Sequence, residues 1–120
     1  MSEPICRVKV AFDFEAAHRL PQHPGKCKEL HGHSYHLVVT VARRVAQETG
    51  MAIDFADLKH IVRREVVDRL DHTYLNDTIG NPTAEVLSVW IWEALREPLV
   101  GLVEVSLWET RNCAVVYRGE

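Results

Sequence analysis

The sequence lacks the features of a membrane protein, a secreted disulfide scaffold or a general nucleic-acid binder. No apolar run approaches the roughly 20 residues that a helix needs to span a bilayer, and the acidic start of the chain does not predict a signal peptide. The cysteines number 3 and include no CxxC pair, which favours reduced thiols in a cytoplasmic protein. The net charge of −3 argues against nucleic acid as a partner.

The pattern that is present suits one domain, 1–120, because a chain of this length supports a single core. Two segments with strict alternation, 7–17 and 31–44, predict half-buried strands. The apolar face of the first strand continues to His18, whose imidazole is therefore expected to point inward. Tyr35 is expected to pack in the core from the second strand.

Apolar residues at helical spacing follow the two strands. They predict one helix over 54–70, with Asp54 as its N-cap, and a second helix with Pro82 at or near its first position. Two further strands are expected at 102–110 and 113–118. The order ββααββ predicts an α+β domain, with a four-stranded antiparallel sheet and two helices on one face.

Three histidines are expected to meet at one end of this sheet. His31 and His33 lie two residues apart on a strand and point to the same side, and His18 ends the neighbouring strand on the matching face. Three neutral imidazoles with a fourth position open form a catalytic zinc arrangement. The alternative is that these histidines cap their strands and form only local hydrogen bonds. No such partners are expected for three other histidines, His23, His36 and His60.

Cys27 has two chemical interpretations. Four positions before His31, it is placed to complete a His3Cys structural zinc site, which closes the metal to substrate. Alternatively it is a reactive thiol, whose pKa is lowered by Lys26, Lys28 and a bound metal. A buried structural cysteine is disfavoured because the flanking residues are strongly polar.

Two acidic positions also stand out. Glu109 continues the apolar face of the strand over 102–110, so a carboxylate ends an otherwise apolar surface. The pair Asp71 and His72 follows the first predicted helix, where a protonated histidine favours the negative end of the helix dipole. By itself that pair predicts only a helix C-terminal cap.

Seven motifs in order cover nearly the whole chain: FEAAHRLP (14–21), CKELHGHSY (27–35), IDFADLK (53–59), LDHTYLN (70–76), NPTAEVL (81–87), WET (108–110) and YRGE (117–120). Together they resemble the 6-pyruvoyl-tetrahydropterin synthase family, most closely its bacterial branch, the 6-carboxy-tetrahydropterin synthases of queuosine biosynthesis. The three-residue gap in CxxxHGH is similar to that branch, since the pyruvoyl-forming synthases typically have a longer gap. A folate-pathway relative typically carries a glutamate near this cysteine, and Glu29 keeps that variant open.

The resemblance implies the tunnelling fold. In that fold, ββααββ subunits join their sheets into a trimeric barrel, and two trimers stack as a hexamer with active sites between subunits. Barrel closure suits a four-stranded sheet, because it pairs the edges that a lone sheet leaves open. The implied protein is a cytoplasmic homo-oligomeric enzyme, with neither nucleic acid nor membrane as a partner.

The resemblance also implies residue roles. Cys27 corresponds to a general base, and Asp71 and His72 to a pair that reaches this cysteine from a neighbouring subunit. Glu109 corresponds to the pterin anchor, since a carboxylate accepts the two parallel N–H donors of the pterin edge. The implied zinc ligands are His18, His31 and His33.

The implied reaction is a zinc-dependent lyase reaction. It converts 7,8-dihydroneopterin triphosphate to 6-carboxy-5,6,7,8-tetrahydropterin with release of acetaldehyde and triphosphate, and zinc acts as a Lewis acid. The alternative product is 6-pyruvoyl-tetrahydropterin. No Walker-type loop is present, so Arg19, Lys26 and Lys28 are the residues expected to meet the triphosphate. Thr83 and Glu85 are expected to line the pterin pocket from another subunit.

Overall fold

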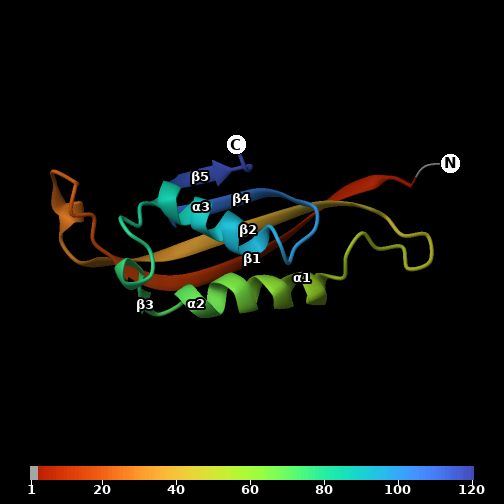
Figure 1. Cartoon of the computed structure of the whole chain (residues 1–120), viewed down its shortest axis with the longest axis horizontal. Coiled ribbons are helices and arrows are strands. Elements are labelled where there is room, and N and C mark those ends of the chain that lie inside the picture. Colours follow the sequence, from red (N-terminus) through yellow and green to blue (C-terminus); the bar gives the residue numbers. More distant parts are fainter. Residues whose placement is uncertain (1–2) are drawn as a thin grey trace.

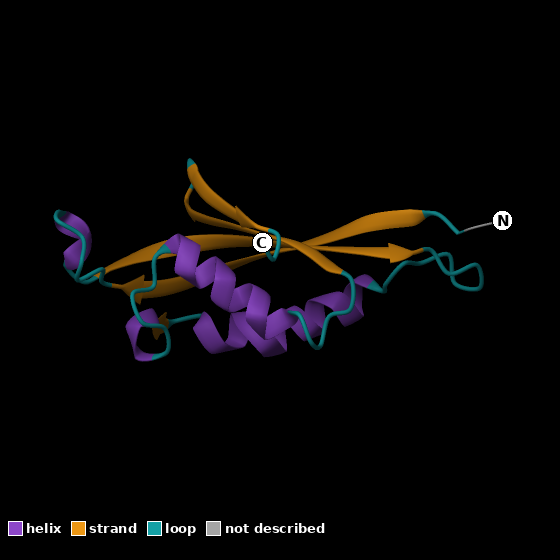
Figure 2. Cartoon of the chain, turned by 45° about the horizontal axis from the view of Figure 1, so that its top comes forward, coloured by secondary structure: helices purple, strands orange, loops and turns teal. Residues whose placement is uncertain are grey.

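The computed structural model describes residues 3–120 as an elongated sheet with helices along one face (Figures 1 and 2). Its extents are 57 × 25 × 24 Å. The strands are β1 (Ile5–His18), β2 (His31–Arg44), β3 (Thr73–Tyr74), β4 (Leu102–Thr110) and β5 (Cys113–Tyr117). The helical segments are α1 (Phe55–Val62), a π-helical turn (Arg63–Val67), α2 (Asp68–Leu70) and α3 (Ala84–Leu95), with short 3-10 turns at Lys26–Lys28 and Leu75–Asp77.

The sheet has five strands in the order β3-β1-β2-β4-β5. The predicted α+β class and the four antiparallel strands are confirmed, but the sheet as predicted was one strand short. β3 pairs in parallel with β1, through Ala16 with Thr73 and Ala17 with Tyr74, so the sheet is mixed. A two-residue strand carries no alternation that a sequence pattern can detect. The barrel and the hexamer stay predictions, since the structure describes one chain.

The first helical stretch runs from α1 through the π-helical turn to α2, as the apolar spacing over 54–70 predicts. Asp54 caps it, because its carboxylate accepts a hydrogen bond of 2.7 Å from the backbone N–H of Ala56. The side chains that this stretch buries against the sheet recur at helical spacing: Leu58, Val62, Val66, Val67 and Leu70.

The start of α3 differs slightly from the sequence-based expectation. Thr83, and not Pro82, sits at the boundary: its hydroxyl accepts a hydrogen bond of 3.1 Å from the N–H of Val86, and the helix begins at Ala84. Pro82 therefore precedes the cap by one residue. Its carbonyl oxygen lies outside the helix and is free to accept a hydrogen bond from another element.

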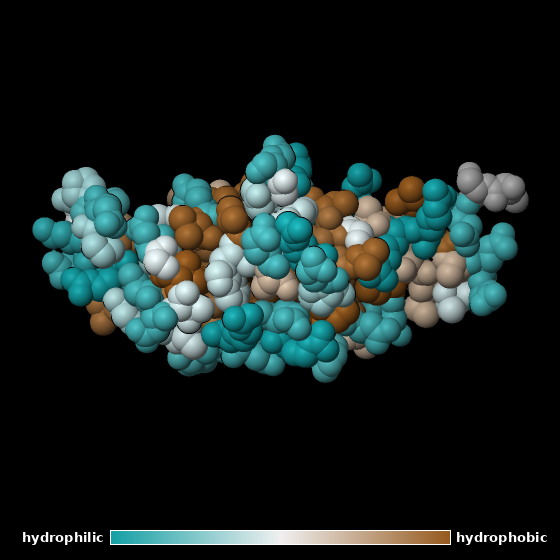
Figure 3. Space-filling model, in the orientation of Figure 1, coloured by the Kyte–Doolittle hydropathy of each residue, from teal (hydrophilic) through white to brown (hydrophobic). Residues whose placement is uncertain are grey.

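The core lies between the sheet and the helices. It takes alternate side chains of the three longest strands: Val10, Phe12, Phe14 and Ala16 of β1, Tyr35, Leu37, Val39 and Val41 of β2, and Val105 and Leu107 of β4. The face shown in Figure 3 is mixed, with hydrophobic groups emerging between polar ones in the middle of the molecule. Among residues 3–120, no helix combines the length and apolar character that a membrane crossing requires.

Candidate metal and substrate site

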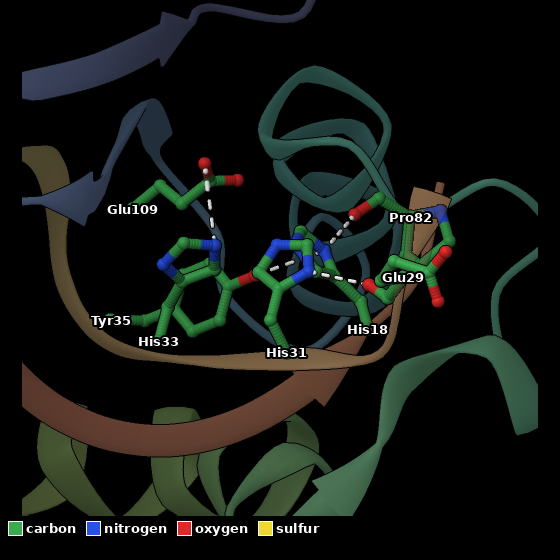
Figure 4. A network of polar contacts seen from close by, with 7 residues as sticks. All are labelled: His18, Glu29, His31, His33, Tyr35, Pro82 and Glu109. Atoms are coloured by element: carbon green, nitrogen blue, oxygen red, sulfur yellow. Dashed lines mark hydrogen bonds and ion pairs between the residues drawn. The ribbon is translucent and has the colours of Figure 1, made fainter. Parts of the chain in front are cut away.

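The three histidines predicted to meet do lie together, where β1 and β2 end side by side. In the β1–β2 register His18 is opposite His31, and Ala16 is opposite His33. One ring nitrogen from each histidine lies within 4.8 Å of the others (Figure 4). His18 is fully buried, and the other two rings are partly exposed. The strand parity read from the sequence thus places these three side chains on one side of the sheet end.

Backbone carbonyls fix the tautomer of two of these rings. The Nδ1 of His18 lies 2.9 Å from the carbonyl oxygen of Pro82, and the Nδ1 of His31 lies 2.7 Å from that of Glu29 (Figure 4). A carbonyl oxygen only accepts, so each Nδ1 carries the proton and donates it. Each Nε2 is left with a lone pair, and the two Nε2 atoms face each other at 2.9 Å. Two facing lone pairs repel unless a cation lies between them, which is the arrangement that a metal ion needs.

The third ring, His33, also fits a metal. Its Nε2 is buried and has no hydrogen-bond partner among the described residues, and the nearest oxygen of Glu109 is 3.6 Å away. Burial lowers the pKa of His33; the Glu109 carboxylate opposes this, and the neighbouring His18 and His31 add to it. A low pKa keeps the imidazole neutral, which is the form that binds metals. The residues present therefore fit a metal ion held by three imidazoles.

Cys27 lies near this cluster but outside it. In the part of the chain that the structure describes, the only metal-binding group of three or more side chains consists of His18, His31 and His33. Cys27 instead lines a cavity of about 450 Å³ together with Glu109 and residues of the α3 N-terminus. Its thiol is free and half-buried. Cys27 is therefore not among the three side chains that the described structure places together for a metal ion.

The same cavity gathers several of the predicted substrate-binding residues. Thr83 and Glu85 line it from the same chain as Cys27, whereas a neighbouring subunit was expected to supply them. Glu109 extends from the end of β4 toward His33 (Figure 4). His23, which was expected to have no partner in a site, also lines this cavity.

Tyr35 contacts the histidine cluster through its hydroxyl group. The residue is completely buried, as expected of a core side chain, and its hydroxyl lies 3.3 Å from Nδ1 of His18. Burial, and then the negative charge of Glu109, raise the pKa of Tyr35 far above its usual value, so the phenol stays neutral. No sequence signal separates this tyrosine from an ordinary core residue. The Pro82 and Glu29 carbonyls were missed for a related reason, because any residue supplies a backbone oxygen.

Asp71 and His72 lie elsewhere. They follow α2 beside β1, and His72 lines a different cavity, of about 430 Å³, with Glu15 and His33. Asp71 accepts a hydrogen bond of 2.9 Å from the backbone N–H of Glu15, and this bond lowers the pKa of Asp71, with smaller contributions from His72. Within one chain this pair does not share a cavity with Cys27.

The three basic residues expected to bind triphosphate all lie in the loop between β1 and β2. Arg19 is held by two hydrogen bonds of its backbone with the side chain of Asn76, at 3.0 and 2.8 Å. Its guanidinium donates to the carbonyl of Lys28 at 3.3 Å. Lys26 and Lys28 flank Cys27 in a 3-10 turn and are exposed. Among residues 3–120 neither lysine forms an ion pair, so both charges are available to an anion.

Comparison with known proteins gives a consistent result. Residues 7–120 match the family described as 6-pyruvoyl tetrahydropterin synthase. A 6-carboxy-5,6,7,8-tetrahydropterin synthase of Synechocystis sp. is 46% identical over 113 residues, which cover 88% of each chain. A 6-pyruvoyl tetrahydrobiopterin synthase of Dictyostelium discoideum is 40% identical over 102 residues, covering 80% of this chain and 76% of that protein.

The fold agrees as well. The solved structure of Caenorhabditis elegans 6-pyruvoyl tetrahydropterin synthase superposes with a TM-score of 0.91 at 27% identity, covering 100% of this chain and 99% of the other. Sequence and fold thus match the same family over almost the entire length. The chain belongs to the 6-pyruvoyl tetrahydropterin synthase family.

Proposed function

We propose that this protein is a zinc-dependent lyase that converts 7,8-dihydroneopterin triphosphate and water to 6-carboxy-5,6,7,8-tetrahydropterin, acetaldehyde and triphosphate, as in queuosine biosynthesis. The observation that carries the proposal is the pair of Nε2 atoms of His18 and His31 facing each other at 2.9 Å, next to the cavity lined by Cys27 and Glu109. The relative from Synechocystis sp., named a 6-carboxy-5,6,7,8-tetrahydropterin synthase, supports this product. The gap of three residues between Cys27 and the HGH motif supports it too.

The metal contributes Lewis acidity. His18, His31 and His33 would hold a zinc ion, which would supply Lewis acidity toward the substrate's side-chain oxygens. The carbonyls of Pro82 and Glu29 orient two of the ligand rings and keep each Nε2 available.

The chain's own residues bind the substrate and move protons. Glu109 accepts the two parallel N–H donors of the pterin edge, in a partly buried position where these bonds are stronger than in water. Cys27 removes a proton from the substrate's side chain, and the exposed cations Lys26 and Lys28 flank it in the chain. Together with Arg19, these lysines meet the triphosphate as point charges.

Asp71 and His72 act, in this proposal, on Cys27 of a neighbouring subunit. The two cavities of one chain are separate, so the pair serves a thiol only across a subunit contact. A cytoplasmic hexamer built from two trimeric barrels provides that contact. Mixing Cys27→Ala and His72→Ala subunits after reversible dissociation tests it. Recovery of part of the wild-type activity is expected, whereas a mixture that stays inactive contradicts the shared site.

Product analysis tests the reaction. Pure protein is incubated with 7,8-dihydroneopterin triphosphate, and acetaldehyde and the pterin product are measured by chromatography. Acetaldehyde and 6-carboxy-5,6,7,8-tetrahydropterin in equal amounts are expected. A 6-pyruvoyl product without acetaldehyde favours the second candidate, which the relative from Dictyostelium discoideum keeps open. A folate-pathway product is the third and weaker alternative.

A Cys27→Ala variant separates an enzyme from a zinc-binding module. The thiol lies outside the histidine cluster, so the variant is expected to keep its zinc and lose turnover. Zinc content is measured by atomic absorption on the same sample that is assayed. Loss of zinc together with activity makes Cys27 a ligand and defeats its assignment as the base.

A further inference from the structure

The helices leave one face of the sheet open (Figure 2). A further polar cavity, of about 410 Å³, lies on this face. It is lined from four strands or their ends, and Lys9, Thr40 and Glu104 lie in one row across the sheet, because Lys9 pairs with Thr40 and Thr40 with Glu104. Their neighbours in sequence, such as Val10, Val39 and Val105, point into the core. This cavity shares no residue with the one that contains Cys27.

The net charge of the residues that line this cavity is opposite in sign to that of the whole protein. Its lining has three cations, Arg7, Lys9 and Arg118, and one carboxylate, Glu104, in a chain whose net charge is −3. The guanidinium of Arg118 binds Glu104 at 2.9 Å, and this bond is the main cause that lowers the pKa of Glu104. Among residues 3–120, Arg7 and Lys9 form no ion pair. Three cations against one carboxylate leave the lining of the cavity with a net positive charge.

Thr40 gives a second, independent observation. The residue is only 3% exposed although it lies on the open face of the sheet. The residue lines the cavity, and its buried hydroxyl has no hydrogen-bond partner among the described residues. A buried hydroxyl without a partner is costly, so an acceptor in the cavity that takes its proton is favoured.

We infer that this cavity binds a phosphate-type oxyanion that carries about two negative charges. Among the lining residues, Arg7 offers a planar donor fork, Lys9 a point charge and Thr40 a hydroxyl donor. The guanidinium of Arg118, paired with Glu104, offsets the negative charge of that carboxylate. The inference does not depend on the proposed reaction, because it uses none of the residues assigned to that reaction.

Titration calorimetry with inorganic phosphate tests the site. The titrations are run at constant ionic strength against chloride, so that general screening is the same in all of them. An Arg7→Gln/Lys9→Gln variant is expected to bind phosphate at least about 10-fold more weakly than the wild type. The matched control, Arg64→Gln/Arg96→Gln, removes the same charge from exposed helical positions and is expected to bind as the wild type does.

A second variant separates the ligand from a structural role of the hydroxyl. Thr40→Val has nearly the same shape, so without phosphate it is expected to melt at the same or a higher temperature than the wild type. With phosphate, its rise in melting temperature is expected to be smaller than that of the wild type. Melting below the wild type without phosphate, together with an undiminished phosphate effect, shows that the hydroxyl has another partner and overturns the inference.

The location of the anion is tested separately. A Lys26→Gln/Lys28→Gln variant removes two charges at the other basic cluster, beside Cys27. Phosphate binding that survives this change but not Arg7→Gln/Lys9→Gln supports the open-face site. Binding that shows the reverse dependence, or no binding by the wild type, overturns it.

Discussion

A large, zinc-dependent rise in melting temperature is the sharpest consequence of the histidine geometry. The facing Nε2 atoms of His18 and His31, at 2.9 Å, repel in the metal-free protein and are satisfied by a cation. At a free zinc concentration of about 1,000 times Kd, a ligand that binds only the folded state stabilises it by about 4 kcal/mol. With about 2.1 cal/mol/K of unfolding entropy per residue, a chain of 120 residues gains about 16 °C.

The assay is scanning calorimetry of chelator-treated protein, before and after zinc is restored. His31→Ala removes one of the two facing lone pairs, so it is expected to lose most of the zinc effect without melting lower than the metal-free wild type. His60→Ala, an exposed histidine on α1, is the control and should retain the full rise. An equal zinc effect in His31→Ala, or none in the wild type, would refute the reasoning about the tautomers.

Three further changes have defined outcomes. Glu109→Gln keeps the shape of the pterin anchor but removes its charge, so kcat/KM in the acetaldehyde assay should fall by about 10- to 100-fold; an unchanged value is evidence against the anchor. Asp54→Ala removes the α1 N-cap and should cost about 1 kcal/mol in urea unfolding, with activity retained. Asp71 has a lowered pKa in the folded protein, so its ionised carboxylate stabilises the fold at a pH above the unfolded pKa of 3.8. This stabilisation is lost as the pH falls below 3.8 and through the lower pKa of the folded protein. Asp71→Asn should therefore flatten the decline of stability with acid, and an unchanged pH profile contradicts that assignment.

Strand parity was sufficient to predict the histidine cluster. His18 and His31 are opposite each other in an antiparallel pair, and His33 is two residues further on the same face, so period-two alternation alone brings the rings together. Glu109 follows in the same way, because it continues the inward face of β4. These predictions depended on long, regular strands, where a side chain's direction follows directly from its position.

The parts that were missed depend on irregular backbone. β3 is two residues long and arises because the chain returns past the end of β1 after α2. His72 adopts a positive φ of 58° there, a conformation that cannot be predicted from a histidine in the sequence. Pro82 was expected at the start of a helix, but its more important contribution is a carbonyl oxygen that orients His18. The residue type at a position does not predict which side chain will donate a hydrogen bond to its backbone carbonyl oxygen.

In the proposed mechanism a single subunit is incomplete, because its site is divided between two cavities. His33 lines the cavity beside His72, while its neighbour Glu109 lines the cavity beside Cys27. Within one chain the proposed base, Cys27, and His72 of the pair proposed to assist it thus line different cavities. At the same time β3 and β5 leave both edges of the sheet unpaired in the described chain. Pairing these edges between copies buries exposed backbone groups, and it is also the simplest way to bring Asp71 and His72 of one copy to Cys27 of the next.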